Sequence, residues 1–201
     1  MAKKKVTTYT WDMFFKRLQE NIFRPKRQTK DILFRLVFGD DRQALLQLYN
    51  VLHGTAYTDP HELQIVTLDN AIYISRKNDL AFLLAGSINM YEHQSTLNPN
   101  MPVRFLIYLA QEYQLLVEST DRSLYGSELI PLPTPQCVVF YNGIADTPDE
   151  YELRLSSAFS NQDVEPAVEV VVNVININYG HNEHLMQGCG LLSQYAQFVA
   201  A

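Results

Sequence analysis

The sequence predicts an α/β fold in which a mixed central β-sheet is flanked by helices. Apolar residues recur at helical spacing in some segments and alternate with polar residues in others, and the two patterns are interleaved along the chain. The chain has 201 residues and 47% of them are hydrophobic, which is enough for one well-packed domain. The expected order is helices, three strands, a helix, two strands and a final helix.

Two helices are expected first. Thr29 is a suitable N-cap for a helix over DILFRLVF, and Gly39 is a suitable end. Asp40 or Asp41 then caps a second helix, RQALLQLYNVL, whose apolar residues recur at helical spacing until Gly54. Two further helices are expected, over residues 102–118 and from near His184 to the C-terminus.

Strands are predicted where apolar residues alternate or form short β-branched runs. The expected strands are residues 62–75, 77–85, 88–94, the run QCVVFYNG and residues 167–177. The second and third of these should form a hairpin, because Gly86-Ser87 between them is typical of a two-residue type II′ turn.

Charge is distributed unevenly along the chain. The net charge is -6, yet residues 1–30 contain nine lysines and arginines against two acidic residues, a balance of +7, and the remaining residues carry -13. A basic arm on an acidic body suits a polyanionic partner. An ordinary solvated tail explains the arm equally well, and the acidic body disfavours tight DNA binding unless cations offset the repulsion.

The composition also predicts a cytoplasmic protein that does not bind membranes. The basic N-terminus is not followed by an apolar segment, so it is not a secretory signal, and no apolar run approaches the length of a bilayer span. Cys137 and Cys189 lie far apart and in no metal-ligand spacing. They are expected to be buried thiols in a reducing compartment.

The predicted hairpin gathers three polar side chains. In the register set by a Gly86-Ser87 loop, Asp79 faces Gln94 across the two strands. Because side chains alternate along a strand, Asp79, Glu92 and Gln94 then converge at one end of one face. His93 points to the opposite face and is expected to be structural.

Two neighbouring carboxylates on a sheet repel each other, and a divalent cation removes that penalty. Asp79, Glu92 and the amide oxygen of Gln94 offer oxygen ligands of the kind that Mg²⁺ prefers, with positions left for water and phosphate. The alternative is a pair of exposed carboxylates at a strand end, with no partner.

The site residues belong to a longer pattern. A strand with Asp79, a turn, a strand ending in Glu92-His93-Gln94-Ser95, and a helix with Arg104 and Tyr108 follow one another. The run NDLAFLLAGSINMYEHQSTLNPNMPVRFLIYLAQEY thereby resembles the recombination-promoting nuclease and putative transposase family of the PD-(D/E)XK nuclease superfamily. The resemblance covers about residues 29–195.

The resemblance implies a restriction-endonuclease-like core over residues 29–201, preceded by a basic N-terminal arm or leader at residues 1–28. It implies an Mg²⁺- or Mn²⁺-dependent DNA endonuclease, a hydrolase of phosphodiester bonds linked to recombination or transposition. Asp79 and Glu92 would hold the metal and Gln94 would be the third catalytic residue. Cleavage of both strands of a duplex is easiest from a symmetric homodimer, which is therefore an expected assembly.

Three residues are expected to contact DNA by the same resemblance: Arg35, Arg104 and Tyr108. An acid on the first helix, here Asp31, can join the metal shell in the superfamily, although a charge opposing the helix dipole is the simpler interpretation. Gln94 stands where the superfamily name carries Lys, and glutamine cannot place a positive charge over the attacking water. A catalytically degenerate nuclease fold that binds protein or DNA is therefore the alternative function.

Overall fold

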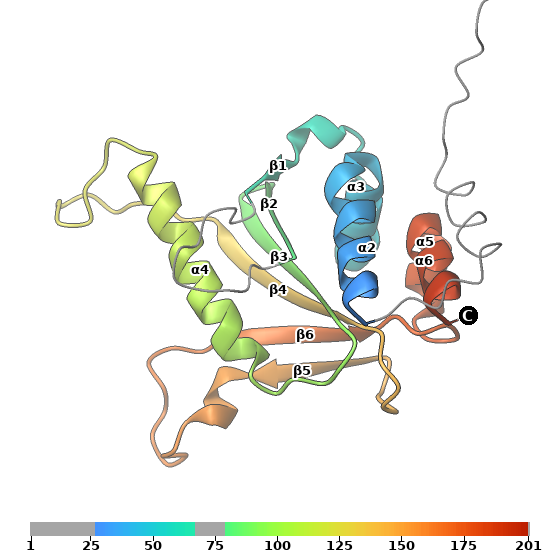
Figure 1. Ribbon diagram of the computed structural model, residues 1–201. Helices are drawn as coiled ribbons and strands as arrows, with labels where there is room; N and C mark the ends of the chain where they lie inside the picture. Colours follow the sequence, from blue (N-terminus) through green and yellow to red (C-terminus); the bar gives the residue numbers. More distant parts are fainter. Residues whose placement is uncertain (1–26, 67–78, 201) are drawn as a thin grey trace, which may run out of the picture.

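The computed structural model describes residues 27–66 and 79–200, and these form a six-stranded mixed sheet with helices on both faces (Figure 1). The prediction of an α/β protein with a mixed sheet packed against helices is confirmed. The strands are β1 (Gln64–Ile65), β2 (Leu80–Leu84), β3 (Ser87–Gln94), β4 (Thr134–Tyr141), β5 (Glu150–Arg154) and β6 (Val171–Asn176). The helices are α2 (Arg27–Asp40), α3 (Arg42–His53), α4 (Met101–Glu118), α5 (Glu183–Gly188) and α6 (Gly190–Ala200), with short 3₁₀ turns at Pro60–Glu62 and Leu155–Ala158.

The strand order across the sheet is β1-β2-β3-β4-β6-β5. β2 is antiparallel to both of its neighbours, β1 and β3, whereas β3, β4 and β6 run parallel, and β5 lies antiparallel to β6 at the outer side. The parallel step from β3 to β4 requires a crossover, and α4 supplies it. The sheet therefore combines the antiparallel β2–β3 hairpin with a parallel central part made of β3, β4 and β6.

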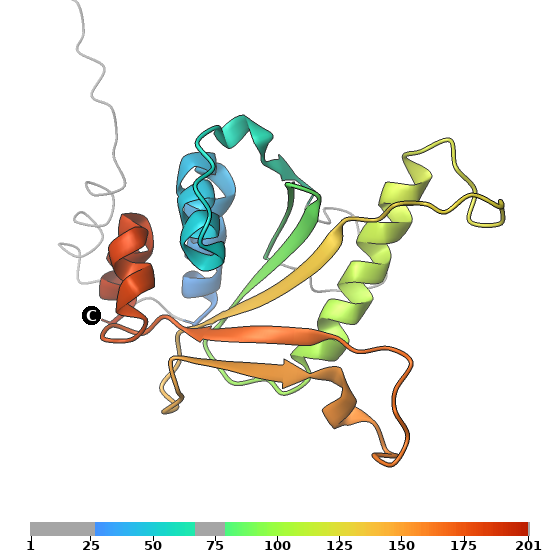
Figure 2. The same ribbon diagram turned by 180° about the vertical axis from the view of Figure 1, so that it is seen from behind.

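The helices form two layers, one on each face of the sheet. α4 covers one face alone, while α2, α3, α5 and α6 cover the other, as the two opposite views show (Figures 1 and 2). Each interface has its own buried apolar cluster. The α4 side includes Ala81, Ile88, Met90, Phe105, Val139 and Val174, and the other side includes Phe34, Leu45, Phe82, Tyr91, Phe140 and Tyr195.

The predicted caps are right for α3 and wrong for α2. The Asp41 side chain accepts a hydrogen bond from the Ala44 backbone N–H at 3.0 Å, and Gly54 ends α3 in the left-handed region at φ 61°. Thr29, however, lies inside α2 rather than before it, and Gly39 lies in its last turn, since this helix spans Arg27–Asp40.

The C-terminal helix predicted from near His184 is two helices. α5 ends at Gly188 and α6 begins at Gly190, with the fully buried Cys189 between them. A Cβ atom at Gly188 would lie 2.5 Å from a Val51 methyl group, so glycine permits α5 to approach α3 closely. Both cysteines are free and buried, as predicted.

The strand predicted over residues 62–75 is described only in its first part. Gln64–Ile65 pair with β2, Glu62 lies in the preceding 3₁₀ turn, and residues 67–75 of the predicted strand lie outside the described part of the chain. Within the described ranges, no helix is long and apolar enough to cross a membrane.

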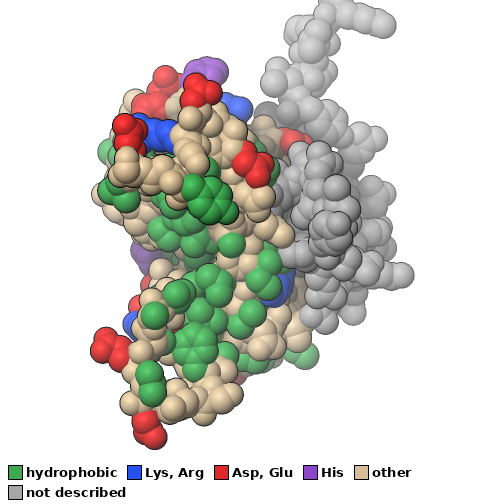
Figure 3. Space-filling model, turned by 90° about the vertical axis from the view of Figure 1, so that its left-hand side faces the viewer, with side chains coloured by type: hydrophobic (Ala, Val, Ile, Leu, Met, Phe, Trp, Pro, Cys, Tyr) green, Lys and Arg blue, Asp and Glu red, His purple; other side chains and the backbone are tan. Residues whose placement is uncertain are grey.

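The end of the molecule beyond α4 carries exposed apolar side chains. Leu124, Tyr125 and Leu129, in the segment between α4 and β4, are 71%, 101% and 90% exposed. Figure 3 views the molecule from this side and shows hydrophobic side chains gathered among polar surface.

Candidate active site at the end of the β2–β3 hairpin

The turn of the hairpin is one residue earlier than predicted. Leu84 pairs with Ser87, so the two-residue loop is Ala85-Gly86, and both residues have positive φ, 50° and 78°. Positive φ at both loop positions is typical of a type I′ turn rather than the expected type II′ turn. Alanine is uncommon at such a position, which is why the sequence favoured the wrong loop.

The corrected register moves Asp79 opposite Glu92 instead of Gln94. Leu80 pairs with Tyr91, and continuing the ladder by one residue places Asp79 level with Glu92. The faces of the strands do not change, because the register moves by two residues and the side-chain period is two. Ala81, opposite Met90 rather than Glu92, still lies on the α4 side of the sheet.

Glu92 is the most buried member of the site. Its side chain is 2% exposed, and its Oε2 atom accepts hydrogen bonds from Arg104 Nη2 at 2.8 Å and from Gln94 Nε2 at 3.3 Å. No group in the described ranges hydrogen-bonds the buried Oε1 atom. The carboxyl group therefore has one well-supported oxygen and one oxygen available to a ligand.

The surroundings of Glu92 favour its protonated form. Burial raises its pKa to about 8, and the neighbouring Asp79 charge adds to this increase. Arg104 and the hydrogen bonds from Arg104 and Gln94 act in the opposite direction but do not cancel the first two effects. Two carboxyl groups side by side, one of them buried, therefore disfavour double ionisation unless a cation joins them.

Arg104 and Tyr108 support Glu92 from α4. They lie four residues apart and so share one side of the helix. Besides the Glu92 ion pair, Arg104 donates to the Tyr108 hydroxyl from Nε and Nη2, at 3.3 and 3.2 Å, and its Nη1 lies 3.2 Å from Met101 Sδ. Tyr108 is 3% exposed and Arg104 21%. In this arrangement both residues position Glu92, and Tyr108 is the more deeply buried of the two.

Asp79 is fixed to the backbone of the opposite strand. Its Oδ2 atom accepts a hydrogen bond from the His93 N–H at 2.7 Å. The His93 ring points to the other face, as predicted, where it stacks on Phe34 and its Nε2 lies 2.9 Å from the Tyr195 hydroxyl. His93 thus connects the carboxylate end of the hairpin to the helices on the far face.

Other sequence-predicted residues are not brought to this site. Arg35 is exposed on α2, in the helix layer that covers the opposite face from Glu92. The Asp31 side chain lies outside the described part of α2, as do residues 1–26, most of the predicted basic arm. The structure therefore joins Asp79, Glu92, Gln94, Arg104 and Tyr108, and leaves Arg35 apart.

The fit of a metal rests on oxygen ligands alone. In the described part of the chain, no three His, Cys, Asp or Glu side chains are grouped to hold an ion. The available set is two carboxyl groups and the Gln94 amide, which suits a cation that keeps several waters, such as Mg²⁺. The unsupported Oε1 of Glu92 and the adjacent Asp79 fit this role; the Arg104–Glu92 ion pair competes with it.

Two buried groups near the site had no sequence signal. Glu112, one turn beyond Tyr108 on α4, is 1% exposed, its Oε1 has no described hydrogen-bond partner, and burial raises its pKa to about 7. The Ser95 hydroxyl, directly after Gln94, is also buried without a described partner. A single Glu in a helix pattern is indistinguishable from a surface residue until its surroundings are known.

Comparison with known proteins gives no relative. No protein-family model, no curated protein and no solved structure matches the chain.

Proposed function

We propose that this protein is a metal-dependent DNA endonuclease of the PD-(D/E)XK superfamily, with Asp79, Glu92 and Gln94 as its catalytic residues. The observation that carries the proposal is the pair of carboxyl groups, Asp79 and Glu92, held level on one face at the end of the β2–β3 hairpin. Burying a carboxyl group beside another is costly, and function is a common reason for retaining such a cost.

The order of the elements supports a restriction-endonuclease-like core. The hairpin β2–β3 carries the carboxyl groups, α4 crosses over the same face, and β4 returns parallel to β3. The site thus lies between a sheet and a crossover helix, where α4 contributes Arg104. The motif order Asp79, Glu92-His93-Gln94, Arg104 also follows the family pattern described above.

The three metal-binding residues and Arg104 have different expected roles. Asp79, Glu92 and the Gln94 amide oxygen would hold Mg²⁺ or Mn²⁺. When bound, the ion lowers the pKa of a water molecule and stabilises the charge that develops on an attacked phosphodiester. Arg104 keeps the Glu92 carboxyl group in place through the 2.8 Å ion pair. Other parts of the proposal rest on the sequence. They are DNA contacts by Arg35, Arg104 and Tyr108, a cytoplasmic location and a homodimer.

The test is cleavage of plasmid DNA in Mg²⁺ or Mn²⁺ by the full chain and by Asp79→Asn. Asparagine keeps an acceptor for the His93 N–H but removes the charge, so folding should survive while cleavage is lost. Asp163→Ala, in an exposed loop, is the control and should cut like the unchanged protein. Equal cleavage by Asp79→Asn and the unchanged protein would reject the assignment.

A degenerate nuclease fold that binds protein or DNA is the second candidate. It is favoured by the Gln94 amide, which donates to Glu92 where a lysine would bring a charge, and by Arg104, whose guanidinium already contacts the Glu92 carboxyl group. Electron paramagnetic resonance of added Mn²⁺ separates the two. Binding that Asp79→Asn abolishes supports the nuclease, whereas no Mn²⁺ binding and no cleavage, with retained DNA or protein binding, supports the module.

A further inference from the structure

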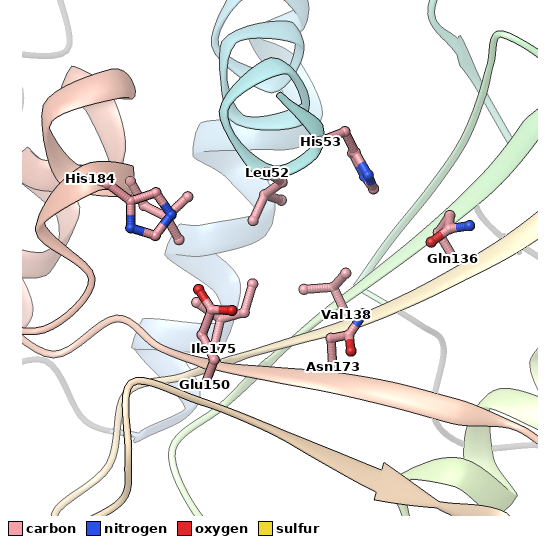
Figure 4. A pocket seen from close by; sticks show the side chains of 9 residues that line it. Leu52, His53, Gln136, Val138, Glu150, Asn173, Ile175 and His184 are labelled. Atoms are coloured by element: carbon pink, nitrogen blue, oxygen red, sulfur yellow. The ribbon is translucent and has the colours of Figure 1, made fainter. Parts of the chain in front are cut away.

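A second site lies on the other face of the sheet, away from the carboxyl groups. It is a pocket of about 160 Å³ between the end of α3, the first turn of α5 and the strands below them (Figure 4). Val138 of β4 and Ile175 of β6 form its apolar floor, and Leu52 and Leu185 contribute aliphatic side chains from the helices. The pocket thus offers a slot with an aliphatic floor between a sheet and a helix layer, and polar atoms make up the larger part of its exposed lining.

Polar side chains surround this slot. Gln136 and Asn173 come from the adjacent strands β4 and β6, and Glu150 comes from β5. In Figure 4, His184 and Glu150 lie on one side of the pocket and His53 and Gln136 on the other. Planar amides at the rim of an apolar slot can pair with the donor and acceptor edge of a flat ring.

Buried polar groups without a described hydrogen-bond partner lie beside the pocket, and of their residues His53 lines it. Asn89 is fully buried, yet neither of its amide atoms has a hydrogen-bond partner within the described ranges. The Tyr91 hydroxyl and the Nε2 atom of His53 are also buried without a described hydrogen-bond partner. Asn89 pairs in register with Gln136, and Tyr91 with Val138, so both stand next to lining residues. Buried polar groups in proteins are normally satisfied.

The size and charge of the pocket restrict the ligand. A cavity of about 150 Å³ holds one benzene ring, so this pocket accepts a single flat ring system. Among the described residues the lining has no Lys or Arg, and its acidic member, Glu150, disfavours anions. Burial lowers the pKa of His53, which keeps that imidazole neutral at neutral pH. A phosphate or carboxylate ligand is therefore disfavoured.

We propose that this pocket binds an uncharged nitrogen heterocycle of nucleobase size, with its ring between the aliphatic side chains and its edge on the amides of Gln136 and Asn173. Such a ring carries both donors and acceptors and so complements the amides of Gln136 and Asn173, which line the pocket. The proposal is independent of nuclease activity, because the pocket and the carboxyl groups lie on opposite faces of the sheet.

The experiment is calorimetric titration of the full chain with adenosine, guanosine, cytidine and uridine in turn, without metal. At least one nucleoside should bind with one-to-one stoichiometry. Asn173→Leu and Gln136→Leu should each weaken it at least tenfold; both positions are partly or largely exposed, so the fold should be retained. Gln47→Leu, on the exposed side of α3, is the matched control and should bind unchanged.

The nucleoside 5′-monophosphates and inorganic phosphate complete the test. The monophosphates should bind no more tightly than the nucleosides, because the described lining has no Lys or Arg side chain. Saturable binding of inorganic phosphate alone, or tighter binding of the monophosphates, would overturn the assignment. So would the absence of binding by all four nucleosides, or equal weakening by Gln47→Leu and Asn173→Leu.

Discussion

The ion pair between Arg104 and Glu92 provides a direct test of the site. In Arg104→Met, a long apolar side chain replaces the guanidinium, which removes the 2.8 Å bond to Glu92 and the two bonds to the Tyr108 hydroxyl. The packing along α4 is largely preserved, so the main change is electrostatic. We expect a loss of stability whose size depends on pH.

The magnitude follows from burial and from the protonation of Glu92. Removing one partner of a buried pair costs about 3–5 kcal/mol when a charge is left behind. Glu92 has a pKa of about 8, raised by burial and by Asp79, so at about pH 6 it is protonated and the loss should be only about 1–2 kcal/mol.

The sign of the pH dependence is fixed by the raised pKa. A carboxyl group with a higher pKa in the folded state contributes stability below its unfolded pKa and loses that contribution as pH rises through the folded value. Without Arg104 the folded pKa of Glu92 rises further. The penalty should therefore increase above about pH 8, by at most about 1.4 kcal/mol per pH unit, and reach about 2–3 kcal/mol near pH 9.

The measurement is urea unfolding at about pH 6 and pH 9. Arg154→Met is the matched control, because Arg154 pairs with Glu152 at 2.6 Å but both side chains are about half exposed, 51% and 49%. An exposed pair contributes at most about 1 kcal/mol. Equal losses in the two variants, or a loss for Arg104→Met that does not change with pH, would refute the reasoning.

Three further perturbations test the surrounding structure. Gly143→Ala places a Cβ atom 2.6 Å from the Ser95 carbonyl oxygen and against the Tyr141 hydroxyl. Thermal unfolding should therefore show a loss of about 1–3 kcal/mol in the free energy of unfolding. Gly190→Ala is the control and should be near neutral, because the space around Gly190 is open. Glu112→Gln should stabilise the fold by about 2–3 kcal/mol near pH 9 and little near pH 4. The reason is that burial raises the pKa of Glu112 to about 7, so that its ionisation opposes folding as pH rises. Urea unfolding of both proteins at the two pH values measures this difference. Tyr195→Phe should cost about 1–2 kcal/mol in urea unfolding, since it removes the hydroxyl 2.9 Å from His93 Nε2; no change would contradict the anchoring of His93.

The faces of the hairpin were predictable although its register was not. Alternation along residues 88–94 places Glu92 and Gln94 on one face and His93 on the other, whichever of two in-phase registers is adopted. The turn depended on one residue, Ala85, whose φ of 50° is unfavourable for alanine and is imposed by the paired strands. Strand pairing therefore outweighed the local preference of Ala85 for negative φ.

Residues that depend on distant partners were beyond sequence reasoning. Arg104 is recognisable as a helix residue near the motif, but its ion pair with Glu92 follows from how α4 packs on the sheet. The pocket on the opposite face draws its lining from α3, α5 and three strands. No spacing within one segment predicts such a convergence, because its geometry is set only when both layers assemble.

The outer strand β5 has a consequence for self-association. It is the last strand on its side of the described sheet, so its free backbone edge offers hydrogen bonds to any extended chain. Glu150, Glu152 and Arg154 alternate along it and are exposed. A second strand docking there would bring its side chains against these charges. Charged residues on an edge discourage aggregation, and β5 should protect this protein from polymerising through its sheet.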